Sequence, residues 1–246
     1  MSDFNNGAGP IVAGADVDVG LRRFMLGVYN KMALGLLLSA VLAYGTSAYG
    51  PLASLLYNVG EDGRLRGLTI FGLVLQFAPI AVLLFSNFAM RQPTARSAGI
   101  LYWTIVTLIG AGSGIWVLLY TGQSIFMTFL ITSTAFGGLS LIGYMVKRDL
   151  SGLHSFLIMG TWVLFGAALL GALFNIPGSS MIINIVGGLI FAGLVATQTQ
   201  MLKMTYYHVA GDSDRMSAVT SLGALNLYIA FMNLFRIILS LTGARR

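Results

Sequence analysis

Seven stretches of mainly apolar residues recur along this chain, and they constrain its fold more than any other feature. They cover residues 32–49, 68–88, 98–120, 124–146, 153–174, 181–202 and 219–242. Because an α-helix rises about 1.5 Å per residue, about 20 apolar residues are enough to cross roughly 30 Å of hydrocarbon. We therefore predict an all-α integral membrane protein, built as a bundle of seven transmembrane helices.

The composition supports a membrane location and excludes several other classes of function. Of the residues, 57% are apolar and only 9% are charged, whereas about a quarter of the residues in a soluble domain are charged. The absence of cysteine excludes disulfides and thiolate chemistry, and two histidines are too few for a histidine metal cluster. The net charge is +6, but the basic residues are scattered in ones and twos, so we expect no nucleic-acid partner.

Short links between the apolar stretches indicate a single domain. Links such as residues 121–123 and 175–180 force neighbouring helices to run antiparallel, and the longer link after the first stretch is rich in turn residues. We therefore expect residues 22–246 to form one seven-helix transmembrane domain. Residues 1–21 are polar, rich in glycine and aspartate and without an apolar stretch, which predicts a disordered cytoplasmic tail.

The basic residues predict that the amino terminus lies in the cytoplasm. With seven spans, this orientation places nine of the fourteen lysines and arginines on the cytoplasmic side: Arg22, Arg23, Lys31, Arg91, Arg96, Lys147, Arg148, Lys203 and Arg215. Cytoplasmic links of membrane proteins carry an excess of such residues. Arg245 and Arg246 would favour a cytoplasmic carboxyl terminus, which requires one stretch to be re-entrant. We expect seven complete spans, and the side of the carboxyl terminus stays open at this point.

The last apolar stretch carries small and amide side chains on one helical face. Gly223, Asn226, Ala230 and Asn233 follow one another at steps of three, four and three residues. Because lipid offers an amide no hydrogen-bond partner, this face predicts a helix packed among the others. Arg236 is the only charged residue well inside an apolar stretch. Its long side chain either reaches the membrane surface or lines a pore.

The sixth apolar stretch holds other polar side chains that could form a site. One face presents Asn184, Gly187, Phe191, Leu194 and Gln198, while Thr197, Thr199 and Gln200 cluster near the predicted cytoplasmic end. Amides and hydroxyls bind cations or hydrogen-bond neighbouring helices, but they do not change charge with pH. Hydrogen bonds between helices are the simpler interpretation, and cation coordination is the alternative.

Glycines in the third and fourth stretches predict close packing of helices. Gly110 and Gly114 form a GxxxG pair, and Gly137, Gly138 and Gly143 lie in the next stretch. Small residues let helix backbones approach where lipid provides no hydrophobic drive for association. A substrate path lined by bare backbone is the alternative interpretation.

All eight acidic residues lie in the tail or in links, outside the apolar stretches. They are Asp3, Asp16, Asp18, Glu61, Asp62, Asp149, Asp212 and Asp214. Proton relays and coupled cation transport commonly depend on carboxylates inside the membrane, and none is predicted here. HExxH, GxSxG and phosphate-binding-loop motifs are also absent from the sequence. We therefore predict no catalytic, cofactor-binding or metal-binding residues and no enzymatic activity.

Three segments of the chain resemble bacterial members of the Bax inhibitor family. Residues 131–151 read ITSTAFGGLSLIGYMVKRDLS, residues 190–194 read IFAGL and residues 227–235 read LYIAFMNLF. The similarity extends from Arg22 to Arg246 in order and spacing. It implies a seven-helix bundle in the bacterial inner membrane with the carboxyl-terminal helix at its centre. The resemblance also makes Lys147, Arg148 and Asp149 a cytoplasmic family motif.

The resemblance implies the fold more firmly than the activity. The family is linked to cation leak, chiefly of calcium, and to restraint of cell death and of membrane proteolysis. Its leak mechanism rests on two facing aspartates, in the sixth and seventh spans, that share a proton. This chain has Gln198 and Ala230 at those positions, so acid-gated transport is not expected.

Two functions stay open on this reasoning. The first is a regulatory protein that binds other membrane proteins within the lipid bilayer, such as the membrane-anchored ATP-dependent protease that bacterial relatives are thought to modulate. The alternative is a leak for calcium or another cation that uses amides in place of carboxylates. The candidate pore or interhelical polar residues are Gln198, Thr199, Gln200, Asn226, Asn233 and Arg236.

Overall fold

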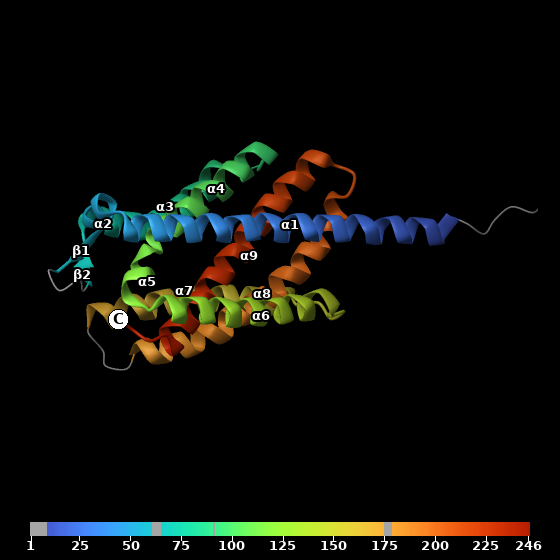
Figure 1. Cartoon of the computed structure of the whole chain (residues 1–246). Coiled ribbons are helices and arrows are strands. Elements are labelled where there is room, and N and C mark those ends of the chain that lie inside the picture. The colour runs from blue at the N-terminus through green and yellow to red at the C-terminus, as the bar shows by residue number, and fades with distance from the viewer. Residues whose placement is uncertain (1–8, 61–64, 91, 175–178) are drawn as a thin grey trace, which may run out of the picture.

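Long helices joined by short links make up most of the computed structural model, which describes residues 9–60, 65–90, 92–174 and 179–246 (Figure 1). The long helices are α1 (Gly9–Ala48), α3 (Ile70–Ala89), α4 (Ala95–Gly112), α6 (Gly122–Met145), α7 (Ser151–Leu173), α8 (Ser179–Val209) and α9 (Ser213–Thr242). The short helices are α2 (Gly50–Leu56) and α5 (Gly114–Leu119). A two-stranded hairpin, β1 (Tyr57–Val59) and β2 (Leu65–Leu68), lies between α2 and α3.

The apolar helices confirm the predicted all-α membrane fold. Within the described residues, six segments are long and apolar enough to cross a bilayer: Val19–Ala48, Ala95–Leu119, Gly122–Met145, Ser151–Gly171, Ser180–Val209 and Ser213–Thr242. The seventh apolar segment, Ile70–Ser86 in α3, is shorter. Each predicted apolar stretch therefore lies largely within one helix or, for residues 98–120, within α4 and α5 together.

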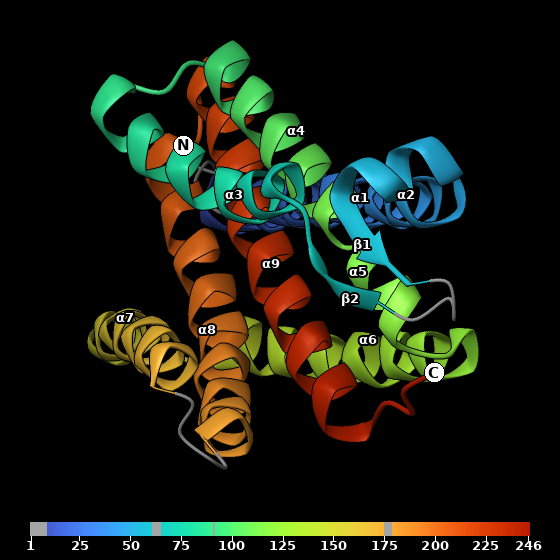
Figure 2. The same ribbon diagram turned by 90° about the vertical axis from the view of Figure 1, so that its left-hand side faces the viewer.

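Helix α9 lies at the centre of the bundle (Figure 2). It packs against α1, α4, α6 and α8. Of its apolar segment 56% is buried, compared with 33% or less of the other five long segments. Small residues on α9 allow this close packing: Gly223 and Ala230 are buried, and the Leu202 side chain of α8 lies against Gly223. The predicted central position of the carboxyl-terminal helix is confirmed.

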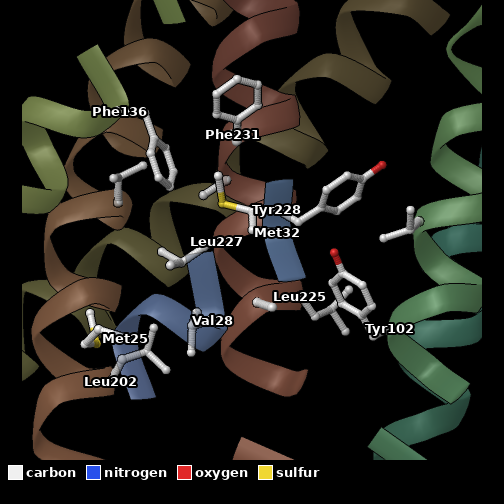
Figure 3. Packing of buried hydrophobic residues seen from close by; sticks show 14 of the residues in the cluster. Met25, Val28, Met32, Tyr102, Phe136, Leu202, Leu225, Leu227, Tyr228 and Phe231 are labelled. Atoms are coloured by element: carbon white, nitrogen blue, oxygen red, sulfur yellow. The ribbon is translucent and has the colours of Figure 1, made fainter. Parts of the chain in front are cut away.

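The core around α9 is apolar (Figure 3), and the hydroxyls of two of its tyrosines, Tyr102 and Tyr228, have hydrogen-bond partners. Members from different helices include Val28, Met32, Tyr102, Phe136, Leu227, Tyr228 and Phe231. The Tyr228 hydroxyl is 2.7 Å from Ser39 Oγ, and the Tyr102 hydroxyl donates to the Lys31 carbonyl oxygen at 2.6 Å. A buried hydroxyl without a partner would be unfavourable, so these bonds let polar atoms join α1 to α9 and to α4.

The links gather at two opposite ends of the bundle (Figure 1). The α3–α4, α6–α7 and α8–α9 links lie at the end where α1 starts, which we call the N-terminal end. The hairpin and the α5–α6 link lie at the other end, which we call the C-terminal end. There the Arg246 amide donates to the Leu119 carbonyl oxygen at 3.0 Å, and the Thr121 amide donates to the Ala244 carbonyl oxygen at 3.2 Å. The carboxyl terminus thus lies opposite the start of α1, as seven complete spans require.

Two regions differ from the sequence-based expectations. The link after the first stretch, predicted only to be rich in turn residues, contains α2 and the hairpin, in which Tyr57 pairs with Leu68. Pro51 suits the first turn of α2, because proline has a helical φ and no amide that needs a partner there. Residues 9–21, expected to be part of a disordered tail, are helical, since extending an existing helix adds one hydrogen bond for each residue ordered. Residues 1–8 of that predicted tail lie outside the described residues.

Candidate polar sites along helices α8 and α9

A cavity of about 240 Å³ lies between α7, α8 and α9. Its polar side chains are His154 from α7, Gln198 and Thr205 from α8, and Asn226 from α9. We call it the Gln198 cavity. It brings together two of the residues that the sequence singled out, Gln198 and Asn226.

The Gln198 side chain offers an unused acceptor to this cavity. Its Oε1 atom is buried and has no hydrogen-bond partner within the described part of the chain. A buried polar atom without a partner is unfavourable by about 1–3 kcal/mol. Asn226, which also lines the cavity, is exposed. Two amide side chains, Gln198 and Asn226, therefore border this cavity.

A second pocket, of about 400 Å³, is formed by α3, α7, α8 and α9. Its polar residues are Asn184 of α8 and Asn233 and Arg236 of α9, with Thr161 of α7. We call it the Arg236 groove. Asn233 Nδ2 donates to the Ile229 carbonyl oxygen of its own helix at 2.9 Å, so this amide is partly satisfied without a neighbouring helix.

The two pockets divide the candidate residues into separate groups. Gln198 and Asn226 line the first, whereas Asn184, Asn233 and Arg236 line the second. On α8, Leu194 lies between the two groups and is only 3% exposed. The face of α8 that the sequence identified therefore contributes to both pockets, but it does not bring Gln198 to Asn233.

Gln200 has a role in the structure that its position in the sequence did not indicate. Its Nε2 donates to the carbonyl oxygens of Val146 at 3.0 Å and Arg148 at 2.8 Å. Its Oε1 accepts a hydrogen bond from the Leu150 amide at 2.8 Å. The side chain is buried, with 4% of it exposed. Gln200 thus fixes the α6–α7 link through three hydrogen bonds, and we call this arrangement the Gln200 clamp.

The hydroxyls beside Gln200 bond mainly within the helices. Thr199 Oγ1 donates to the Val195 carbonyl oxygen at 2.8 Å. Thr197 Oγ1 donates to the Leu194 carbonyl oxygen at 3.2 Å and lies 3.0 Å from His154 Nδ1. Both threonines are fully buried. Only the Thr197 contact with His154 reaches α7, and neither threonine lines either pocket.

The three residues that the resemblance makes a family motif lie on the surface of the α6–α7 link. Lys147, Arg148 and Asp149 are all exposed. Asp149 accepts hydrogen bonds from the Ser151 amide at 2.9 Å and the Ser151 hydroxyl at 3.0 Å, at the start of α7. The three charged side chains therefore stand on a short link whose backbone the Gln200 clamp and Asp149 hold in place.

The acidic side chains that the structure describes lie outside the bundle interior. Asp149, Asp212 and Asp214 are exposed, and Asp212 pairs with Arg215 at 3.3 Å. Among the described residues no three histidine, aspartate or glutamate side chains are grouped to hold a metal ion. The polar interior of this part of the chain is made of amides, hydroxyls and cations.

Sequence reasoning missed the environment of Lys31. Its Nζ atom donates to Ser221 Oγ on α9 at 2.7 Å and lies 5.4 Å from the centre of the Tyr102 ring on α4. Lys31 precedes the first predicted apolar stretch, so its charge was interpreted only as an indication of membrane orientation. Because the first span was predicted to begin at residue 32, nothing in the sequence indicated that Lys31 packs against α4 and α9.

Comparison with known proteins finds relatives along nearly the whole chain. Residues 21–246 match the family described as "Inhibitor of apoptosis-promoting Bax1". An uncharacterized protein of Caulobacter vibrioides is 50% identical over 100% of both chains. An uncharacterized protein of Rickettsia prowazekii is 36% identical over 93% of this chain and 92% of its own. The inner membrane protein YbhL of Escherichia coli is 30% identical over 92% of this chain and 94% of its own.

Proposed function

The chain belongs to the Bax inhibitor family of membrane proteins, and we propose that it is a regulator of the bacterial inner membrane that acts by binding another membrane protein. The resemblance noted in the sequence is thereby confirmed as family membership. The relative YbhL is named an inner membrane protein, which supports the inner membrane for this chain as well. The absence of acidic residues from the apolar stretches argues against an acid-gated transporter and against an enzyme.

The observation that carries this proposal is the Gln200 clamp. A regulator needs a surface that a partner can recognise, and binding is stronger when that surface is already ordered. The α6–α7 link presents Lys147, Arg148 and Asp149 to solvent on a backbone held by three hydrogen bonds from Gln200. A short, charged and pre-ordered link of this kind suits an electrostatic contact with a polar protein surface.

We place this link on the cytoplasmic side. The α3–α4, α6–α7 and α8–α9 links at the N-terminal end include Lys147 and Arg148 and adjoin Arg96 and Arg215. An excess of lysine and arginine favours the cytoplasmic face. The partner that family resemblance suggests is a membrane-anchored ATP-dependent protease, whose ATP-consuming part must also be cytoplasmic.

Co-purification tests the proposed contact. The full chain carries an affinity tag and is crosslinked in native membranes, and recovery of the membrane-anchored protease is measured. Reversing both charges, Lys147→Glu with Arg148→Glu, is expected to lower recovery at least about fivefold, because a charged contact becomes repulsive. Arg96→Glu is the matched control, since Arg96 is also exposed at the N-terminal end. Equal recovery with both variants, or no protease recovered with the unaltered chain, contradicts the proposal.

A second function is supported by the Gln198 cavity. The Gln198 side-chain oxygen, which has no partner among the described residues, is of the type that binds calcium or sodium ions. Asn226 on the same cavity supplies a second amide. Such a site would conduct without a carboxylate, so its activity would not depend on a shared proton.

Flux measurements distinguish this second function from the first. Liposomes containing the purified chain should leak calcium or sodium faster than empty vesicles, and Gln198→Leu should abolish the difference. The flux should also show no step near neutral pH, because amides do not titrate there. A flux equal to that of empty vesicles excludes the leak, and a step that persists after loss of both His154 and His208 excludes the amide mechanism.

A further inference from the structure

Arg236 is a cation without a counter-charge. It lies in α9 six residues before Thr242, which is roughly 9 Å along the helix from the C-terminal end of the bundle. Within the part of the chain that the structure describes, neither an ion pair nor a hydrogen bond involves its guanidinium group, and the one ion pair found joins Arg215 to Asp212. Arg236 is exposed and lines the Arg236 groove.

Two lysines inside the spanning helices have partners among the described residues. Lys31 donates to Ser221 Oγ at 2.7 Å, and Lys203 donates to the Tyr144 carbonyl oxygen at 3.2 Å and lies over the Tyr144 ring. A charged side chain at membrane depth is unfavourable unless it is paired or reaches water. Arg236 therefore differs from both lysines in needing a partner from outside the described chain.

The groove has the composition of a site for an amphiphile with an anionic head. Asn184 and Asn233 line it beside Arg236 and add amide donors, and no hydrogen bond joins the Asn184 side chain to another described residue. The remaining wall is apolar and includes Leu83 and Phe165. Its volume of about 400 Å³ is in the usual range for a small-molecule site, roughly 300–1,000 Å³.

We propose that the Arg236 groove binds one anionic phospholipid. The phosphate group accepts hydrogen bonds from the Arg236 guanidinium, and an acyl chain lies along the apolar wall between α3 and α7. Charge complementarity selects this occupant, because guanidinium is well matched to phosphate oxygens. The depth of Arg236 in the membrane agrees with a phosphate contact, since a long arginine side chain near a helix end reaches the headgroup region. This site lies apart from the α6–α7 link, so the proposal does not depend on the proposed function.

Native mass spectrometry of the full chain, purified in detergent, tests this proposal. Phosphatidylglycerol and phosphatidylcholine with identical acyl chains are added at equal concentration. The unaltered chain is expected to retain one phosphatidylglycerol about fivefold more often than phosphatidylcholine, the factor typical of one basic residue near an anionic lipid. Arg236→Gln should remove this preference, and Arg236→Lys should keep most of it.

Further variants separate the groove from general charge effects. Arg22→Gln is the matched control, because Arg22 lines a pocket between α1 and α6 on another part of the surface, and the preference should be unchanged. Ala168→Phe should lower retention of both lipids by filling the groove while leaving Arg236 in place. Millimolar glycerol phosphate should displace nothing, since it lacks an acyl chain.

The proposal fails under any of three results. One is that Arg236→Gln retains phosphatidylglycerol as well as the unaltered chain does. Another is that Arg22→Gln loses the preference to the same extent, which would indicate net charge alone. The third is that glycerol phosphate displaces the lipid, which would indicate a phosphate site without a lipid. Size-exclusion chromatography identifies misfolded variants, and Ala168→Phe then provides the test that leaves the charge unaltered.

Discussion

Gln198 and Gln200 are two residues apart on α8, yet their side chains have opposite environments. Gln200 uses both ends of its amide on the α6–α7 link, whereas the Gln198 oxygen is buried without a partner among the described residues. Successive helical residues point about 100° apart, so two positions are enough to move a side chain from one neighbour to another. The same residue type therefore has a structural role at one position and an open binding capacity at the other.

Loss of the Gln200 clamp should destabilise the protein and loosen the α6–α7 link. Gln200→Leu leaves the Leu150 amide and two carbonyl groups without their partner, and we expect the free energy of unfolding to fall by about 1–3 kcal/mol. Thermal unfolding in detergent measures this change. Trypsin should also cleave faster after Lys147 and Arg148, because their backbone is no longer held.

Gln123→Leu is the control for this prediction, since Gln123 is an exposed amide at the start of α6, at the other end of the bundle. It should leave both the unfolding temperature and the cleavage rate unchanged. Unchanged cleavage in Gln200→Leu would mean that the link is ordered by Asp149 and Ser151 alone.

Sequence reasoning predicted which residue types are available to these sites but not their partners. The apolar stretch around residues 181–202 placed Gln198 and Gln200 within a membrane helix near one end. It could not show that the α6–α7 link folds back onto Gln200, because that depends on where α6 stops and how α7 packs. Pairing Gln198 with Asn233 was likewise beyond helical periodicity, since it depends on the relative height of α8 and α9.

At the scale of helices, the glycines of α6 occupy two kinds of position, one packed against a neighbouring helix and one facing open space. A side chain on Gly143 would meet the backbone of Ala196 in α8, whereas the space beside Gly137 and Gly138 is open. In the same way, Gly110 lies against the backbone of Ser39. Gly110 and Gly143 therefore match the predicted close packing of helices, and Gly137 and Gly138 do not.

Substituting these glycines should separate the two kinds of position. Gly143→Ala forces α6 away from α8, and we expect a loss of about 1–3 kcal/mol in the free energy of unfolding, as for other overpacked sites. Gly138→Ala should cause no loss, because the added methyl group meets open space and alanine favours helix. Unfolding temperatures of both variants in the same detergent provide the comparison. Equal temperatures would show that the α6–α8 contact can relax.

The sequence did not predict the α4–α5 break or the hairpin, because neither is marked by a change in the pattern of apolar residues. The break between α4 and α5 occurs at Ser113, within a continuous apolar stretch, so hydropathy shows no boundary there. The hairpin is short and has a register irregularity between Asn58 and Val59, and its pairing depends on contacts across the chain. Long apolar helices are predictable from composition alone, whereas such connections depend on their surroundings.

For the molecule as a whole, membrane orientation follows from the two ends of the bundle, which lie on opposite sides of the bilayer when the helices span it. The links at the N-terminal end lie opposite the paired segment formed by Leu119–Thr121 and Ala244–Arg246 (Figure 1). In a bilayer, one set must be cytoplasmic and the other translocated. Lysine and arginine at the N-terminal end favour its exposure to the cytoplasm.

Single cysteines test this orientation without background, since the chain has none of its own. Arg148→Cys and Ala244→Cys place a thiol at exposed positions of the two ends. In spheroplasts, a membrane-impermeant maleimide should label Ala244→Cys directly and Arg148→Cys only after permeabilisation. Labelling of both variants in intact spheroplasts would contradict seven complete spans, and the reverse order would contradict a cytoplasmic N-terminal end.

The central position of α9 has a consequence for biosynthesis. Helices leave the ribosome in order, so α9 is the last of the spanning helices to reach the translocon, although α1, α4, α6 and α8 all pack against it. Until it arrives, side chains such as Tyr102 and Phe136 lack their native neighbours Tyr228 and Phe231. The α1–α4 and α6–α8 contacts can form earlier, but the core around α9 is completed only after α9 is inserted, so final assembly is a late step.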